Sequence, residues 1–422
     1  MSARNDGSPG CEAGAGVSWG LPRGVLVALV LLLFLLPRAA FGAEGIGGVP
    51  VGEAPTGGAD GSGGRALRPD PYAALHAVEM KAVVGLQRVE GLGTVMQWVT
   101  DLGPGKPMLA LIALLLCFSG PRVAGRVAIM VVICLWMREC LAMLLQSPRP
   151  YWFGEAVRTF KDPPIGSPTF SLPSGHATAA AAFWLFLAGE VRRRWAWVGA
   201  VLITLAVCVS RVYLGLHFVS DVVLGAAFGA LWAFAFRALE TPVTERWRVL
   251  SPSGRAGVAV GAGLGLIAVS LGIQAWVLTQ VPEGVWPPYG ATARLSKGFV
   301  WSGGALCGMA LAGVAPVAWS ATADSWPMRW RRLAIAVVPA ALYFGRPESL
   351  RLGQFLPADA IALKWILRFV AGTFLGWAAL YLLPRFWMVL GCVPVGRAST
   401  GEPGSGNVEP GSPGVTGGAD GR

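Results

Sequence analysis

The pattern of apolar and polar residues predicts a chain built of membrane-spanning helices. Apolar stretches separated by short polar loops follow one another, and several approach the roughly 20 residues that a helix needs to cross a bilayer. Five of them cover residues 107–119, 123–146, 176–190, 195–214 and 217–237. About four more follow, near 256–279, 298–319, 333–345 and 361–383. We therefore predict an all-α fold, a polytopic transmembrane helical bundle.

The N-terminal segment, residues 1–42, has two interpretations. Its apolar core at 25–36 is followed by small residues, which predicts a signal peptide; the alternative is a first transmembrane helix. Residues 43–70 are rich in Gly, Ala and Pro and predict a flexible linker, and residues 392–422 predict a disordered tail. Residues 71–100 mix polar residues with apolar ones at helical spacing, which favours a helix at the membrane interface over a span.

Composition and charge support the membrane assignment. The chain is 54% hydrophobic and only 14% charged, whereas soluble domains carry about 25% charged residues. The net charge of +11 comes mostly from arginines in alternate loops, such as Arg192–Arg194, which the positive-inside rule places in the cytoplasm. The loop at 147–175 and the turn at 214–217 then face the exterior. We read the charge as topology and expect no nucleic-acid partner, and the cysteine spacing predicts neither a metal site nor a disulfide.

Two of the three histidines stand in motifs that fit one active site. His217 precedes Asp221 by four residues, so a helix places both on one face, one turn apart. A neutral histidine can attack phosphorus, and a carboxylate can hold its other nitrogen and fix the tautomer. The alternative is a structural polar pair, which is costly inside a membrane. The third histidine, His76, lies in the amphipathic segment and is expected at the surface.

A second motif, Pro173-Ser174-Gly175-His176, stands just before an alanine-rich helical run. A helix N-terminus with free backbone N–H groups binds anions, and His176 could protonate a leaving oxygen. The same residues would also serve as a plain N-cap. Arg149 and Arg211 offer charge-assisted contacts to phosphate, or could snorkel to the interface. All these residues map to the same predicted face of the membrane.

These motifs resemble the type-2 phosphatidic-acid phosphatase superfamily, which includes lipid phosphate phosphatases and vanadium haloperoxidases. Two of its signatures match completely, Pro173-Ser174-Gly175-His176 and Ser210-Arg211 with His217 and Asp221. The resemblance covers about residues 80–240. It implies a haloperoxidase-like helical core that works without metal or cofactor. The roles that it implies are phosphate binding by Arg149, Ser174, Gly175 and Arg211, proton donation by His176, nucleophilic attack by His217 and orientation by Asp221.

The first signature of the family departs from the pattern in this chain. Arg149-Pro150 is present, but Ala142 stands where the family has a lysine. Loss of a phosphate-binding cation should weaken stabilisation of the transition state. We hypothesise that Arg138, Arg158 or Lys161 supplies the missing charge.

The sequence thus predicts a phosphatase core at 71–240 with about five transmembrane helices, and a C-terminal membrane region at 241–391 of unassigned function. The expected enzyme hydrolyses a lipid phosphate or diphosphate, such as phosphatidate, phosphatidylglycerol phosphate or undecaprenyl diphosphate, through a phosphohistidine. Its site would face the exterior of a bacterial inner membrane. The alternatives are a lipid phosphotransferase that uses the same site and a non-catalytic protein that binds or transports lipid phosphates. The sequence does not fix the oligomeric state.

Overall fold

A computed structural model describes most of the region between residues 70 and 393. The described residues are 70, 72–104, 106–153, 157–160, 169–280, 289, 293, 298–314, 325–345 and 361–393. Within these ranges every regular element is a helix, which confirms the predicted all-α class. The predicted signal peptide or first helix, all but one residue of the predicted linker, and the tail beyond residue 393 lie outside the described residues.

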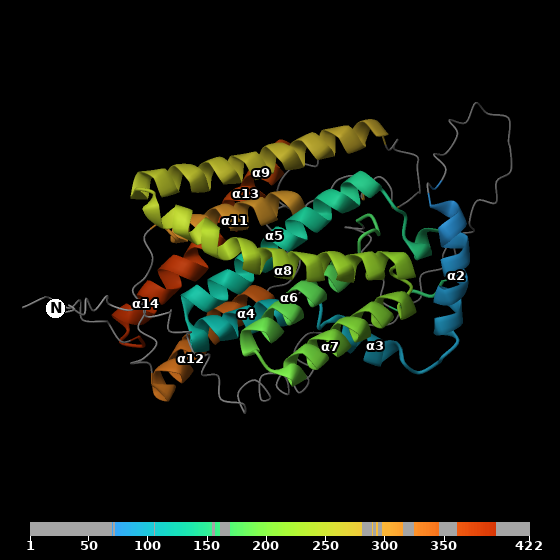
Figure 1. The fold of residues 1–422 in the computed structure, drawn as a ribbon, viewed down its shortest axis with the longest axis horizontal. Helices are drawn as coiled ribbons and strands as arrows, with labels where there is room; N and C mark the ends of the chain where they lie inside the picture. The colour runs from blue at the N-terminus through green and yellow to red at the C-terminus, as the bar shows by residue number, and fades with distance from the viewer. Residues whose placement is uncertain are drawn as a thin grey trace, which may run out of the picture.

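Five helices form the first half of the bundle and run along its long axis (Figure 1). They are α4 (Lys106–Ser119), α5 (Pro121–Leu145), α6 (Gly175–Val191), α7 (Arg194–Tyr213) and α8 (Val219–Val249). Helix α6 is the central one, because its alanine-rich stretch from Ala177 to Ala182 is buried against both α5 and α8. Small side chains permit this close approach. Thus Gly229 of α8 lies directly against the backbone of Thr178 in α6.

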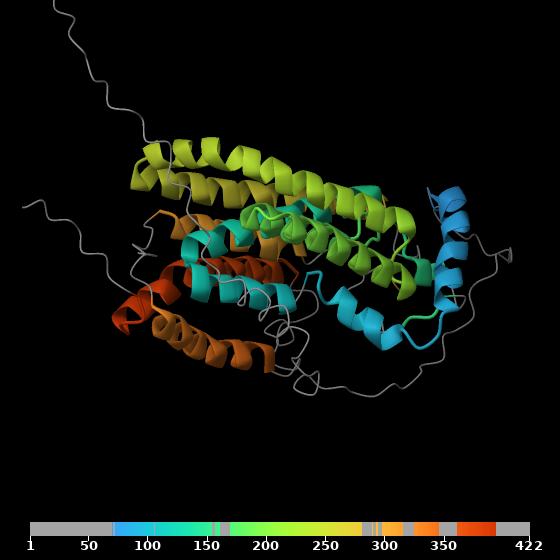
Figure 2. The ribbon, with the colours of Figure 1, turned by 60° about the horizontal axis from the view of Figure 1, so that its bottom comes forward.

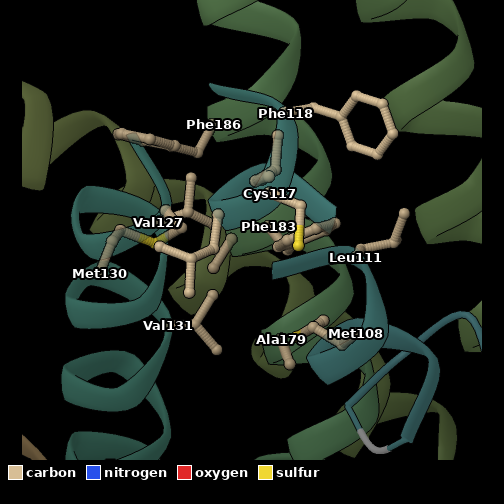
Figure 3. Packing of buried hydrophobic residues seen from close by; sticks show 14 of the residues in the cluster. Met108, Leu111, Cys117, Phe118, Val127, Met130, Val131, Ala179, Phe183 and Phe186 are labelled. Carbon is tan, nitrogen blue, oxygen red and sulfur yellow. The ribbon is translucent and has the colours of Figure 1, made fainter. Parts of the chain in front are cut away.

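The apolar core of this half lies between α4, α5 and α6 (Figure 3). Met108 and Leu111 of α4 pack towards Val127 of α5 and Phe183 of α6. Between helices in a membrane, such packing is stabilised by van der Waals contact and not by removal of apolar surface from water. The core therefore fixes how the three helices are placed, and with them the start of α6.

In the second half, the described residues form four helical segments. They are α9 (Pro252–Gln280), α11 (Gly298–Ala312), α12 (Trp326–Gly345) and α13 (Ile361–Trp377), the last continuing through a π-helical turn, η5 (Ala378–Leu382), into α14 (Leu383–Val389). Glycines allow α11 and α13 to touch backbone to backbone, as at Gly304 and Gly308. Helices α9 and α11 also pack on α5, so the two halves form one bundle.

Helix α2 (Ala73–Gln87) crosses one end of the bundle at a steep angle to the long helices (Figures 1 and 2), and α3 (Gly93–Thr100) follows it. Its inward face carries polar residues, including the buried His76 and Gln87. Its outward face carries apolar residues such as Val78, which is 67% exposed. The inward face thus combines polar residues with the buried Val83, and the exposed face is mostly apolar, which suits a lipid environment.

Among the described residues, five helices are long and apolar enough to cross a membrane, at 121–153, 194–213, 219–249, 252–280 and 366–389. Together with the apolar composition, they identify an integral membrane protein. The end of the bundle away from α2 gathers charged residues. Arg126 of α5 pairs with Glu190 of α6 and Glu240 of α8, and Arg237 of α8 also pairs with Glu190.

Candidate active site

The histidines and arginines of the sequence motifs come together at the end of the bundle that α2 crosses. Helix α7 ends there and α6 and α8 begin there, so residues distant in sequence meet (Figures 1 and 2). Arg149 follows α5, and its Nη1 lies 3.3 Å from Nε2 of His217. The Ser174 amide, at the start of α6, donates to the carbonyl of Asp221 in α8 (2.9 Å).

His217 is buried, and its two ring nitrogens face different partners. Nδ1 lies 3.0 Å from Ser171 Oγ and 3.4 Å from Asp221 Oδ2. Nε2 faces the guanidinium of Arg149, which can only donate hydrogen bonds. The unprotonated nitrogen is therefore Nε2, and the proton belongs on Nδ1.

The electrostatics of the site favour the neutral form of this ring. Burial holds the pKa of His217 well below its usual 6.5, and the nearby charges of Arg149, Arg211 and Arg138 lower it further. A cationic imidazole has no lone pair to offer, whereas a neutral one with a free Nε2 can attack phosphorus. The geometry and the charge thus agree on a nucleophile-competent histidine.

Ser171 joins His217 to Asp221, and sequence reasoning did not find it. Its hydroxyl donates a short hydrogen bond to Asp221 Oδ2 while its oxygen lies within reach of His217 Nδ1. The same carboxylate oxygen accepts the Phe218 amide (2.8 Å), which closes the first turn of α8. Ser171 comes from the loop before α6, and a lone serine in a loop carries no periodicity or motif that could have identified it.

The Pro-Ser-Gly-His segment forms the N-terminus of α6. Ser174 occupies the N-cap position, but its side chain makes no capping hydrogen bond. Its hydroxyl is buried and has no hydrogen-bond partner among the described residues. The plain N-cap reading therefore does not account for this serine. A buried, unpaired donor beside a helix N-terminus is the arrangement that an oxyanion satisfies.

Arg149 and Arg211 do not snorkel, because both side chains are buried. Arg149 is held by Thr169, with Nε donating to its carbonyl (2.7 Å) and Nη2 to its hydroxyl (3.0 Å). Arg211, in the last turn of α7, lies 3.4 Å from Thr100 Oγ1 through Nη1. Its Nε has no hydrogen-bond partner in the described part of the chain. This leaves guanidinium donors available for an anion.

The three residues considered as replacement cations have different positions. Arg138 lies buried beneath the Pro-Ser-Gly-His segment and donates to the carbonyls of Pro173 (2.7 Å) and Phe170 (3.2 Å), and to Glu139 (2.5 Å). Its charge is therefore close to the loop, but its donors hold protein groups. The Arg158 side chain is 67% exposed and 4.0 Å from Glu90. Lys161 lies outside the described residues.

Ala142 is buried in an apolar cluster to which both halves of the chain contribute. The cluster includes Phe170 from the site loop together with Val277 of α9, Ala293 and Val300 of α11. The C-terminal region therefore covers the face of α5 that carries Ala142, where the family resemblance leads us to expect a lysine.

The two remaining histidines also lie at this end. His176, in the first turn of α6, is half-buried, and its ring packs beside Gly103 in the turn before α4. His76 was expected at the surface, and this expectation is wrong. Its side chain is 4% exposed and its ring stacks on Phe218, with centroids 3.9 Å apart. A single sequence gave no sign that the polar side of α2 faces the protein.

Comparison with known families agrees with this geometry. Residues 123–244 match the model of the PAP2 superfamily. These residues form a PAP2 superfamily domain. The PAP2 match contains every motif residue discussed above and confirms the family resemblance of the sequence.

Two relatives of this PAP2 domain are phosphatases. An undecaprenyl-diphosphatase of Sulfolobus acidocaldarius is 26% identical over 39% of this chain and 78% of its own. The human glucose-6-phosphatase 2 is 29% identical over 29% of this chain, and the match spans only 42% of that relative. A crystal structure of a transmembrane PAP2-type phosphatidylglycerolphosphate phosphatase from Bacillus subtilis aligns with a TM-score of 0.35 and 20% identity, over 51% of this chain and 96% of that one.

Proposed function

We propose that this protein is a membrane-embedded phosphatase that hydrolyses a lipid-linked phosphate or diphosphate through a phosphohistidine on His217. The observation that carries the proposal is the orientation of the His217 ring. Its Nδ1 is held by Ser171 and Asp221, and its Nε2 faces Arg149 in buried, positively charged surroundings. A free imidazole nitrogen aimed at anion-binding groups suits attack on phosphorus.

The reaction has two steps. In the first, His217 Nε2 attacks phosphorus and forms a P–N bond while the P–O bond to the leaving group breaks. His176 gives a proton to the leaving oxygen, and Asp221 stabilises the cationic ring through Nδ1–H. In the second step, a water molecule that has lost a proton to His176 attacks phosphorus and the P–N bond breaks. Inorganic phosphate leaves and both histidines return to their starting states, and no metal takes part in either step.

The phosphoryl oxygens would be held throughout by the side chains of Arg149, Arg211 and Ser174 and by the amide of Gly175. Donors that are already in place stabilise the developing charge without having to reorganise. In this scheme Arg138 acts indirectly, because its guanidinium supports the loop carbonyls and adds positive potential.

A lipid substrate is supported by the position of the site. It lies at one end of the membrane-spanning helices, beside a helix whose exposed face is apolar. The undecaprenyl-diphosphatase relative acts on a lipid diphosphate by its name. The arginine-rich loops belong to the opposite end of the bundle, so the positive-inside rule favours a site facing the exterior of a bacterial inner membrane.

The test is phosphate release by the purified protein in detergent, with EDTA present. The panel holds undecaprenyl diphosphate, phosphatidate, phosphatidylglycerol phosphate and, as a soluble comparison, glucose 6-phosphate. We expect release of phosphate from at least one lipid and loss of that release in His217→Ala. The control is Thr204→Ala, which should retain the release. Thr204 is buried in α7, and among the described residues its hydroxyl bonds only the Ala200 carbonyl. Release that persists in folded His217→Ala would refute the histidine mechanism.

A lipid phosphotransferase is the second candidate, and one contact favours it. Tyr289, from the C-terminal region, stacks on Trp152 (centroids 5.8 Å apart) and meets Tyr151 edge-on (5.2 Å) in η2 (Pro150–Phe153), next to Arg149. The C-terminal region thus contributes an aromatic wall near the site, where a second lipid could bind. Product analysis with an added acceptor lipid separates the two, because a transferase would yield a phosphorylated acceptor in place of free phosphate.

A further inference from the structure

The third histidine of the chain lies directly behind the candidate nucleophile. His76 is on the inward face of α2, and its ring lies parallel to that of Phe218, with centroids 3.9 Å apart and an interplanar angle of 9°. Its Nδ1 is 2.7 Å from Asp70 Oδ2. The two side chains are only 5% and 7% exposed, so they form a buried pair.

Asp70 is itself fixed at the start of α2. Its second oxygen, Oδ1, accepts the amide of Tyr72 (2.9 Å), and its backbone carbonyl accepts the amide of Ala73 (3.2 Å). The carboxylate therefore joins the beginning of the helix to the His76 ring. A ring held at one edge by a fixed carboxylate has little freedom to tilt, which makes it a firm surface for Phe218.

Phe218 stands between the two catalytic candidates and is fully buried. It is the N-cap residue of α8, and its amide donates to Asp221 Oδ2 (2.8 Å). Any rotation of this residue would therefore shift both His217, its neighbour, and the carboxylate that its amide holds.

A second contact from α2 secures the same turn. Glu79, one turn after His76, accepts the amide of Ser220 (2.8 Å) and its hydroxyl (2.9 Å). The stack and this cap hold residues 218 and 220 against α2. The contact from Glu79 satisfies one of the free amides at the start of α8, whereas the stack of His76 on Phe218 has no such capping role.

We propose that the buried His76–Asp70 pair is a positioning device that sets the orientation of His217 and Asp221 by stacking on Phe218. The inference rests on the proposed function. His76 does not touch the substrate in this scheme, so it is a positioning residue and not a catalytic one. A displacement of about 1 Å in a reacting group can cost about 100-fold in rate, so a stack that prevents such a shift would matter for catalysis.

The test compares His76→Ala, which removes the stack, with His76→Phe, which keeps a ring there but loses the bond to Asp70. Val78→Ala, on the exposed face of α2, is the matched control. Three quantities are measured in detergent: kcat and KM on the best lipid substrate, inhibition by vanadate and by phosphate, and hydrogen exchange of the amides at 218–221.

For His76→Ala we expect kcat to fall by about 10- to 100-fold with KM changed by less than about twofold, because the nucleophile is displaced while the arginines still bind phosphate. Inhibition by vanadate, which can bond to the histidine, should weaken in parallel, and inhibition by phosphate should not. The Phe218 and Asp221 amides should exchange faster. His76→Phe should recover most of kcat and of the protection, and Val78→Ala should match the wild type.

Equal kcat and equal exchange in His76→Ala and the wild type would overturn the proposal. So would a loss in His76→Ala that His76→Phe does not recover, because the stack would then not be the element that matters. If the wild type releases no phosphate from any substrate, the proposed function fails, but the exchange measurement still decides whether His76 holds the first turn of α8. Should His76→Ala not fold, His76→Phe and Asp70→Asn supply the comparison, with Asp70→Asn expected to lie between wild type and a full loss.

Discussion

The contact between Ser171 and the His217–Asp221 pair leads to a sharp prediction. Ser171 Oγ donates to Asp221 Oδ2 and lies closer to His217 Nδ1 (3.0 Å) than the carboxylate does (3.4 Å). The closer hydrogen-bond partner of the ring is therefore the serine hydroxyl, which links the ring to the carboxylate. Ser171→Ala removes this link while leaving a buried residue of similar size.

The magnitude follows from the strength of the lost bond. A hydrogen bond to a charged group contributes about 1.5–3 kcal/mol, and 1.36 kcal/mol corresponds to tenfold in rate. We therefore expect kcat/KM to fall by roughly 10- to 160-fold. If the ring and the carboxylate of Asp221 move together to bond directly, the loss should lie at the lower end of this range.

The chain offers a matched control in Ser147→Ala. Ser147 is equally buried and touches the same loop, because its carbonyl accepts the Ser171 amide (2.8 Å). Its hydroxyl has only a 3.4 Å contact with the Pro148 carbonyl. This variant should keep nearly full activity, so a loss in Ser171→Ala alone reports the hydroxyl and not the loop.

The assay is steady-state phosphate release by Ser171→Ala, Asp221→Asn and the double variant. If the carboxylate acts partly through the serine, the double variant should be little worse than Asp221→Asn. The coupling energy from the cycle should then exceed about 1 kcal/mol. Effects that add within about 0.5 kcal/mol would refute the relay, because independent sites behave in this way.

Three further predictions concern the charges around the site. Arg138→Lys keeps a charge but not the three-way hydrogen bonding, and should lower kcat/KM by roughly tenfold or more, since each bond from a charged donor contributes about 1.5–3 kcal/mol. In Arg158→Ala, kcat/KM should stay within about twofold of the wild type because that side chain is mostly exposed. Equal losses of kcat/KM in Arg138→Lys and Arg158→Ala would contradict this placement of the two arginines. Ala142→Lys should lower the melting temperature in detergent without raising activity, because it puts an ammonium into an apolar cluster. A variant that is more active and equally stable would show that residue 142 does not lie in an apolar cluster. The lowered pKa of His217 means that the ring stays neutral as the pH falls through 6.5 and is protonated only well below it. Any acid limb of kcat/KM that is due to this group should therefore lie well below pH 6.5. Nitrogen NMR of the three imidazoles checks this prediction, and titration of His217 near 6.5 would contradict it.

The sequence predicted the helices closely where polar residues mark their ends. The predicted segments at 176–190 and 195–214 correspond to α6 (Gly175–Val191) and α7 (Arg194–Tyr213), because Pro-Ser-Gly and three arginines separate apolar runs there. The segment at 217–237 was predicted too short, since α8 continues to Val249. Its polar residues do not end the helix, because Arg237 and Glu240 find partners on neighbouring helices.

The candidate site was predictable only in part, for a physical reason. Residues within a motif, such as His217 and Asp221, are related by the geometry of one helix, so spacing alone places them together. Ser171 and His76 meet them through contacts between segments far apart in sequence, 46 residues in the case of Ser171 and His217. No local pattern records such a meeting, because it depends on how the loop before α6 and the helix α2 pack against the start of α8.

Ala142, where the family resemblance leads us to expect a lysine, and the C-terminal helices are separate features in the sequence, but they meet in the structure. Helices α9 and α11 pack against α5, and Trp136 of α5 donates to Ser270 of α9 (3.1 Å). Their apolar residues reach the cluster around Ala142, where an ammonium would lose its hydration without gaining a partner. A small apolar residue at position 142 is therefore what this packing requires. We propose that positive charge at the Pro-Ser-Gly-His segment comes instead from Arg138, which lies one turn earlier and donates to the carbonyls of Pro173 and Phe170.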